Sequence, residues 1–166
     1  MARFGTRLHE HLGTPPGPLT FDIVKKAAEN RLTESDDLDW KEHLPQPPWD
    51  GQWNELAKDV TSMANTRGGL LIYGVTDQDT RPVGIDPCRV NTQQDAQWIR
   101  NHVQPYLPDI DFTILSTPDG ATSFLVIDVP ASLMATPPRV RHRRQGQGPS
   151  GGRRPLLRPR PHRLDG

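Results

Sequence analysis

Apolar residues along the chain recur at helical spacing in three stretches. In residues 53–64 they follow the i, i+3, i+4 and i+7 pattern of one buried helix face, and residues 20–31 and 91–102 carry shorter versions of the same pattern. Thr20 is placed to cap the first of these helices at its N-terminus. The Gly-Gly pair at 68–69 ends the long one, and its first glycine suits a left-handed C-cap. The pattern therefore predicts about three helices.

Shorter apolar runs have the character of strands. Residues 70–75 are apolar on both faces, which indicates a strand in the centre of a sheet. Residues 38–41 alternate apolar and polar, which places Asp39 and Lys41 on one face of a short strand. Strands are expected at 38–41, 70–75, 83–85, 112–115 and 123–129, the last two joined as a hairpin through the turn Pro118-Asp119-Gly120. The predicted fold class is α+β, a single small domain with a mixed or mostly antiparallel sheet.

The two ends of the chain differ in composition from the middle. Residues 1–19 are rich in Gly and Pro and are expected to form an extended lead-in to a domain at 20–136. Residues 137–166 carry nine Arg, many Gly and Pro and few aliphatic residues, so we expect a disordered tail there. Two interpretations of this tail stay open. It is either an arm for nucleic acid or an anionic surface, or a frameshifted or truncated end in which a GC-rich gene is read out of frame after Met134.

Charge is divided unevenly along the chain. Residues 1–138 hold 11 Lys and Arg against 19 Asp and Glu, whereas the remaining residues hold nine Arg and one Asp. The globular part is therefore acidic, and nucleic-acid binding would need a local basic patch or the tail. No apolar run is long enough to cross a membrane and none resembles a secretory leader, so we expect a cytoplasmic protein without membrane contact. Cys88 is alone, which excludes an internal disulfide and a zinc site built from cysteines.

The sequence lacks the standard catalytic motifs. It contains no GxxxxGK[ST] phosphate loop, no GxGxxG, no GxSxG and no HExxH. Three linked segments remain: an acidic stretch with an aromatic residue before a lysine at 34–42, Ala-Asn-Thr-Arg-Gly-Gly at 64–69, and Gly-Val-Thr-Asp at 74–77, followed by Val-Gly at 83–84. These segments resemble the Schlafen-type AlbA-like domain, a family also described as divergent AAA or DNA-binding. The resemblance covers roughly residues 30–130 and is specific for the fold rather than for an activity.

The resemblance also implies candidate site residues. In the branch of the family with endoribonuclease activity the site holds three acidic residues, which correspond here to Glu34, Asp39 and Asp77. Three carboxylates brought together repel one another, and a divalent cation, Mg²⁺ or Mn²⁺, relieves that repulsion while it polarises a phosphodiester. Lys41 and Arg67 are the expected nucleic-acid-binding residues, because each could neutralise a phosphate. The chain departs from this branch in two ways. Asp39 stands where the branch has Glu, and the partner half of the groove is missing, so a homodimer would have to supply it.

Simpler roles compete with this interpretation. Glu34 lies in an acidic stretch that is by default a solvated loop, and Asp77 lies in a turn where Asp is favoured because its side chain bonds nearby backbone. Residues 65–69 are as well suited to determine the fold as to bind a ligand.

The expected function is a nucleic-acid-binding module that acts on DNA or RNA, with transcriptional regulation in a bacterium as its setting. The alternatives are a metal-dependent endoribonuclease that uses Glu34, Asp39 and Asp77, a domain that binds ATP or another nucleotide, and a purely structural or oligomerising domain. Metal-dependent RNA cleavage would separate the enzyme from the binding module, since binding alone predicts only salt-sensitive association.

Overall fold

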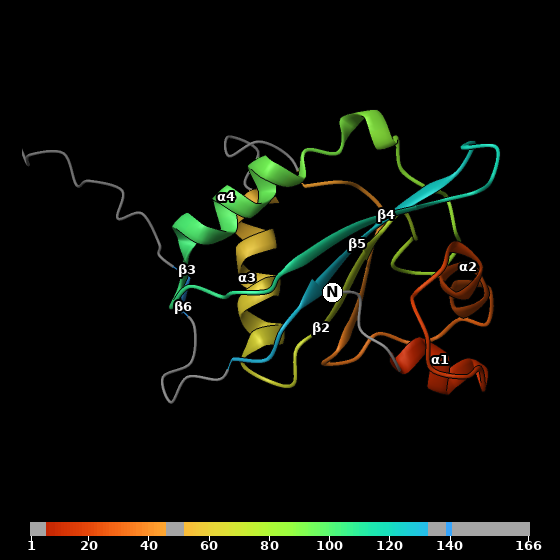
Figure 1. Cartoon of the computed structure of the whole chain (residues 1–166), viewed down its shortest axis with the longest axis horizontal. Coiled ribbons are helices and arrows are strands. Elements are labelled where there is room, and N and C mark those ends of the chain that lie inside the picture. Colours follow the sequence, from red (N-terminus) through yellow and green to blue (C-terminus); the bar gives the residue numbers. More distant parts are fainter. Residues whose placement is uncertain (1–5, 46–51, 133–138, 141–166) are drawn as a thin grey trace, which may run out of the picture.

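The main sheet has four strands in the order β1-β2-β5-β4 (Figure 1). The structure is a computed structural model that describes residues 6–45, 52–132 and 139–140. The strands of the main sheet are β1 (Leu38–Lys41), β2 (Gly69–Tyr73), β4 (Asp111–Ser116) and β5 (Ser123–Val129). β1 runs parallel to β2, and the other neighbouring strands are antiparallel. The mixed sheet and the hairpin predicted from the sequence are therefore confirmed.

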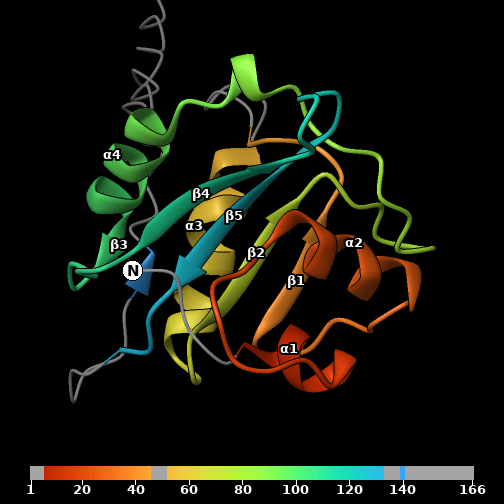
Figure 2. The ribbon, with the colours of Figure 1, turned by 45° about the vertical axis from the view of Figure 1, so that its right-hand side comes forward.

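Helices cover both faces of this sheet (Figures 1 and 2). The helices are α1 (Arg7–Leu12), α2 (Phe21–Glu29), α3 (Gln52–Ala64) and α4 (Thr92–His102), with a short 3-10 helix η2 (Pro87–Arg89) before α4. α1 and α2 lie on one face of the sheet, and α3 and α4 lie on the other. A second, small sheet pairs β3 (Val103–Gln104) with β6 (Arg139–Val140).

Two clusters of buried apolar side chains lie on the two faces of the sheet. Leu71 and Tyr73 of β2 belong to the cluster under α3, whereas Leu70 and Ile72 belong to the cluster under α1 and α2. Every residue of β2 is buried, because the strand has a neighbour on each side and helices above and below it. The prediction of a central strand at this place is confirmed.

The ends of α2 and α3 follow their local sequence. The side-chain oxygen of Thr20 accepts a hydrogen bond from the Ile23 N–H at 3.4 Å, so Thr20 caps α2 as predicted. After α3, Gly68 has φ +71° and donates a hydrogen bond from its N–H to the Met63 carbonyl at 2.9 Å. This is the left-handed C-cap expected of that glycine.

Gly69 begins β2 at a close approach to the chain that precedes β1. The N–H of the next residue, Leu70, donates to the Asp37 carbonyl at 3.0 Å. A Cβ at Gly69 would lie 2.6 Å from the Cα and the carbonyl oxygen of Asp37. Since real side chains do not come so near to backbone atoms, this position requires glycine.

Two expectations from the sequence are wrong. Residues 1–19 are not simply extended, because they include α1, in which Leu8 is fully buried and the Thr6 hydroxyl lies 2.6 Å from His9 Nδ1. This helix is stabilised by packing against α2 rather than by a long apolar pattern of its own. Residues 83–85 do not form a strand. Only Ile85 forms an isolated bridge, with Ser123, and the N–H groups of 83 and 84 both donate to the Gly74 carbonyl just after β2.

The predicted disordered tail lies outside the described residues, except for Arg139–Val140, which form β6. Within the described ranges no helix is long and apolar enough to cross a membrane. Cys88 is exposed and unpaired with another cysteine.

Candidate functional site

The candidate site lies on β1, the edge strand of the main sheet. Leu38 and Trp40 are buried in the cluster under α1 and α2. Because side chains alternate along a strand, Asp39 and Lys41 point to the opposite face, toward α3. An edge strand is only partly covered by the helix layer, so these two polar side chains stay partly exposed. The predicted shared face of Asp39 and Lys41 is confirmed.

Lys41 is the cation at the centre of this site. Its Nζ lies 3.0 Å from Asp39 Oδ2 and 3.1 Å from Oδ2 of Asp59 on α3. Partial burial disfavours the ammonium, but the hydrogen bonds and negative charges of the two carboxylates outweigh that effect and hold the pKa of Lys41 above its ordinary value. Lys41 is therefore charged and already neutralised by two carboxylates, so a phosphate would have to compete with them.

The three acidic residues singled out by the family resemblance lie near one another at this site, and Asp39 is the one that pairs with Lys41. Glu34 Oε1 accepts a hydrogen bond from the Trp40 N–H at 3.1 Å, which anchors the loop before β1. The pKa of Glu34 is raised by its burial, by a hydrogen bond with Asp39, and by the negative charges of Asp39 and Asp77. Asp77 follows the end of β2 and is exposed. The fold thus gathers Glu34, Asp39 and Asp77 from three separate segments.

The observed positions of Glu34, Asp39 and Asp77 do not form a metal-binding site. Across residues 6–45, 52–132 and 139–140, no three His, Cys, Asp or Glu side chains are arranged so that they could hold a metal ion. The Lys41 ammonium, bound to Asp39, supplies the positive charge at this point instead. Binding of Mg²⁺ or Mn²⁺ therefore stays a prediction that the observed geometry does not support.

Sequence reasoning missed Asp59. It lies three residues after Leu56 and four before Met63, both buried, so it interrupts the apolar face of α3. Burial raises the pKa of Asp59, although the charge of Lys41 and the hydrogen bond from it act in the opposite direction. The sequence did contain a signal for this role, namely an aspartate among the apolar residues of one helix face, which suggests a buried carboxylate paired with a cation.

Arg67 does not join Lys41. It lies two residues before β2 begins, beside a cavity of about 230 Å³ that Arg7 and Asp37 also line. Arg7 Nη1 is 3.4 Å from Asp37 Oδ1, which ties α1 to the chain before β1. Lys41 stands opposite Tyr73, at the other end of the two parallel strands. Lys41 is four residues along the chain from Asp37, which is roughly 13 Å of strand, so one phosphate cannot contact both places.

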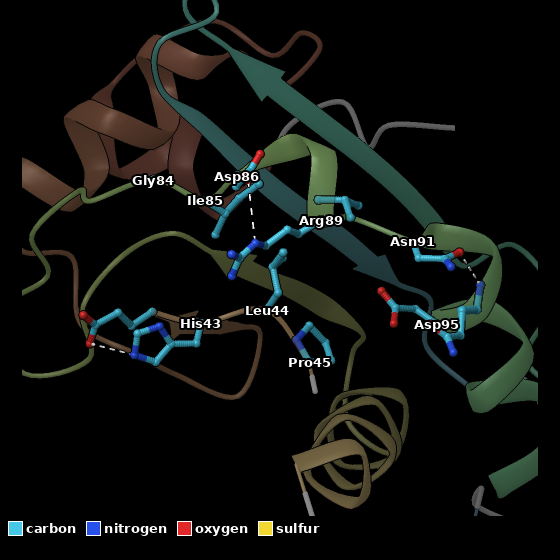
Figure 3. Close-up of a pocket in the computed structure, with 12 residues that line it drawn as sticks. His43, Leu44, Pro45, Gly84, Ile85, Asp86, Arg89, Asn91 and Asp95 are labelled. Carbon is cyan, nitrogen blue, oxygen red and sulfur yellow. Dashed lines mark hydrogen bonds and ion pairs between the residues drawn. The ribbon is translucent and has the colours of Figure 1, made fainter. Parts of the chain in front are cut away.

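Two cavities flank the loop that follows β1. The smaller one, about 240 Å³, lies at the site itself and is lined by Lys41, Asp59 and Asp77 among others. The larger one, about 410 Å³, lies between this loop and the start of α4 (Figure 3). Glu42, His43, Leu44 and Pro45 line both cavities, so the loop is the wall between them.

Asp95 lines the larger cavity and was also missed from the sequence. It lies four residues before the buried Ile99, on the inward face of α4, and is only 6% exposed. Burial raises the pKa of its carboxyl to about 6. An Asp on the inward face of an amphipathic helix was again the available signal.

Comparison with known proteins gives one family. A family model described as Schlafen, AlbA_2 matches residues 34–148, a range that includes Glu34, Asp39, Lys41, Arg67 and Asp77. No curated protein matches the chain.

Solved structures resemble the chain more distantly. The DIP2311 protein from Corynebacterium diphtheriae is 25% identical with a TM-score of 0.47, and the match covers 62% of this chain but only 19% of DIP2311. The N-terminal domain of a protein from Nitrosomonas europaea, whose name relates it to the RecG ATP-dependent DNA helicase, is 21% identical with a TM-score of 0.47. That match covers 85% of this chain and 98% of the domain.

Proposed function

The chain belongs to the Schlafen AlbA_2 family, whose model matches residues 34–148, and on this premise we propose that it is a nucleic-acid-binding module. The observation that carries the proposal is that Glu34, Asp39, Lys41 and Asp77 of the family motif meet at one end of β1 and β2, beside two cavities. A module that reads a flexible single strand needs this combination of polar groups and hollows, because unstacked bases enter pockets that a duplex cannot reach.

Charge is distributed so unevenly that phosphate contacts and base contacts would come from different segments of the chain. Residues 1–138 carry 11 Lys and Arg against 19 Asp and Glu, so they do not attract a phosphate backbone by their overall charge. Residues 139–166 hold nine Arg and one Asp. We assign most phosphate contacts to these arginines, and contacts with the bases to the cavities, where carboxylates accept hydrogen bonds from base N–H groups.

The test is fluorescence anisotropy with labelled single-stranded RNA and labelled duplex DNA over a range of salt concentrations. The full chain is compared with a chain that ends at Val140, which keeps every described element. We expect the full chain to bind RNA with an affinity that falls steeply with salt, and the shortened chain to lose most of that salt dependence. Failure of the full chain to bind either nucleic acid at low salt would refute the proposal.

A metal-dependent endoribonuclease is the second candidate, because Glu34 lies close enough to Asp39 and Asp77 for their charges to raise its pKa; a cation bound there would have to displace Lys41 from Asp39. Incubation of labelled RNA with the full chain, with and without Mn²⁺, followed by a gel, separates it from binding alone. Asp77→Ala is the informative variant because Asp77 is exposed and its loss should leave the fold intact. Asp22→Ala, an exposed carboxylate on α2, is the matched control. Cleavage that requires Mn²⁺ and disappears only in Asp77→Ala would replace the binding module by the enzyme.

A further inference from the structure

The larger cavity has the composition of a binding pocket for a flat polar molecule (Figure 3). Its volume of about 410 Å³ lies within the range of small-ligand pockets, roughly 300–1,000 Å³. The apolar part of its wall comes from the loop after β1 and from the segment before α4, and consists of Leu44, Pro45, Ile85 and Val90. These side chains offer surfaces against which an aromatic ring can pack.

Asp95 supplies a hydrogen-bond acceptor in this cavity. In Figure 3 its carboxylate points from α4 into the cavity, toward Leu44 and Pro45. Within the part of the chain that the structure describes, no N–H or O–H group and no cation is paired with this carboxylate. The residue is 94% buried, but its carboxylate oxygens are not among the sealed polar atoms without a partner, so they face the open cavity and reach water there. A ligand with N–H donors would replace water at these oxygens and pair with the charge in a largely buried place.

Donors lie on the outer side of the same cavity. The Arg89 side chain is 82% exposed, with its Nε 3.8 Å from Asp86 Oδ2. Asn91 accepts a hydrogen bond at Oδ1 from the Gln94 N–H at 3.0 Å, so its NH₂ group is the part of the side chain left to donate. The cavity therefore offers an acceptor in its interior and donors toward solvent.

We propose that this cavity binds one unpaired guanine base of a single-stranded nucleic acid, with Asp95 accepting from the base N1–H and N2–H groups. Guanine presents these two donors side by side, and two carboxylate oxygens match them. Arg89 then lies on the side where the sugar and phosphate would leave the cavity. A lysine or arginine side chain of a protein would also pair with Asp95, but it would leave Arg89 and Asn91 facing a cation. The inference rests on the proposed nucleic-acid-binding function and names the base that it recognises.

The experiment uses the full chain and fluorescent RNA heptamers of uridine that differ only at the central base. The central base is guanine, hypoxanthine or adenine, of which hypoxanthine lacks the N2 amino group and adenine lacks both donors of the proposed contact. We expect the guanine heptamer to bind about tenfold more tightly than the hypoxanthine one and more tightly still than the adenine one. Asp95→Asn should bring the three affinities together, whereas the matched exposed variant Asp22→Asn should keep the guanine preference.

The outcomes separate this inference from the proposed function. Equal binding of the three heptamers by the unmodified chain overturns the guanine assignment and leaves nucleic-acid binding standing. No binding of any heptamer at low salt overturns both. A guanine preference that survives in Asp95→Asn places the recognition elsewhere and also overturns the inference. Equal binding of the heptamers together with Asp95-dependent binding of arginine amide, added as a separate probe, would reassign the cavity to a cationic side chain.

Discussion

Replacement of Asp95 by Asn should make the protein more stable at neutral pH. Asp95 is 6% exposed, and burial raises the pKa of its carboxyl from 3.8 to about 6. The folded state therefore holds a proton between about pH 4 and pH 6 that the unfolded state has released, so stability falls as the pH rises through this window. Above about pH 6 the folded protein carries a buried negative charge that the Asn variant lacks.

The magnitude follows from the size of the pKa change. A difference of roughly two pKa units corresponds to about 3 kcal/mol in the free energy of unfolding. The cavity beside Asp95 is open to water, which screens part of the charge, so we expect about 1–2 kcal/mol for Asp95→Asn at neutral pH. Near pH 4, where the wild-type carboxyl is protonated in the folded state, the two proteins should differ little.

The assay is urea unfolding of both proteins, followed by circular dichroism, at several values between about pH 4 and pH 7.5. Charged and titratable groups that line the cavity or lie behind it are Glu42, His43, Asp59, Tyr73, Asp86 and Arg89. Both proteins carry all of them, so their contributions largely cancel in the difference. A difference between wild type and variant that is constant across this range would refute the reasoning, because it would show that the buried charge is not its source.

Two further substitutions test the packing and the charges around β1. Lys41→Met should lower the free energy of unfolding at neutral pH by about 1–2 kcal/mol, because Asp59 loses its partner. Urea unfolding measures this loss. The control Lys26→Met, at an exposed position on α2, should have little effect. An equal loss in both variants would contradict the role of the ion pairs. Gly69→Ala should cost about 3 kcal/mol or prevent folding, since its Cβ would overlap backbone. Gly17→Ala, where nothing lies within 4 Å of the added Cβ, should unfold like wild type in thermal denaturation.

Most of the fold could be predicted from local patterns in the sequence. β1, α4 and the hairpin of β4 and β5 each carry a periodicity or a turn signal within their own residues. α1 could not be predicted, because it has six residues and is stabilised by the burial of Leu8 against distant elements. The expected strand at 83–85 failed for a related reason. Its alternation of apolar residues is present, but Gly84 adopts φ +78° and the chain turns.

The site was predictable only where its residues belong to one element. The strand period of two places Asp39 and Lys41 on the same face, and this holds in the structure. Asp59 and Asp95 come from helices, and their roles depend on which strand each helix covers. The sequence shows each of them only as a charged residue on an apolar face. Arg67 lines a different cavity from Lys41, so its expected role in nucleic-acid binding stays a prediction for a separate phosphate.

The close approach of Gly69 to the Asp37 backbone shows that some positions of the family motif are needed for the fold, whatever the chain binds. A glycine that no other residue can replace without a clash will persist in any chain that builds this β1–β2 pair, whatever that chain binds. The Gly-Gly pair is thus a marker of architecture. Asp77 of the motif is exposed, and Asp95, outside the motif, faces a cavity, so substitutions at these positions would leave the architecture intact and change the chemistry. Common descent can therefore be recognised from positions such as Gly69 that the fold requires. Differences in activity among relatives should be sought at positions such as Asp77 and Asp95 that the fold does not require.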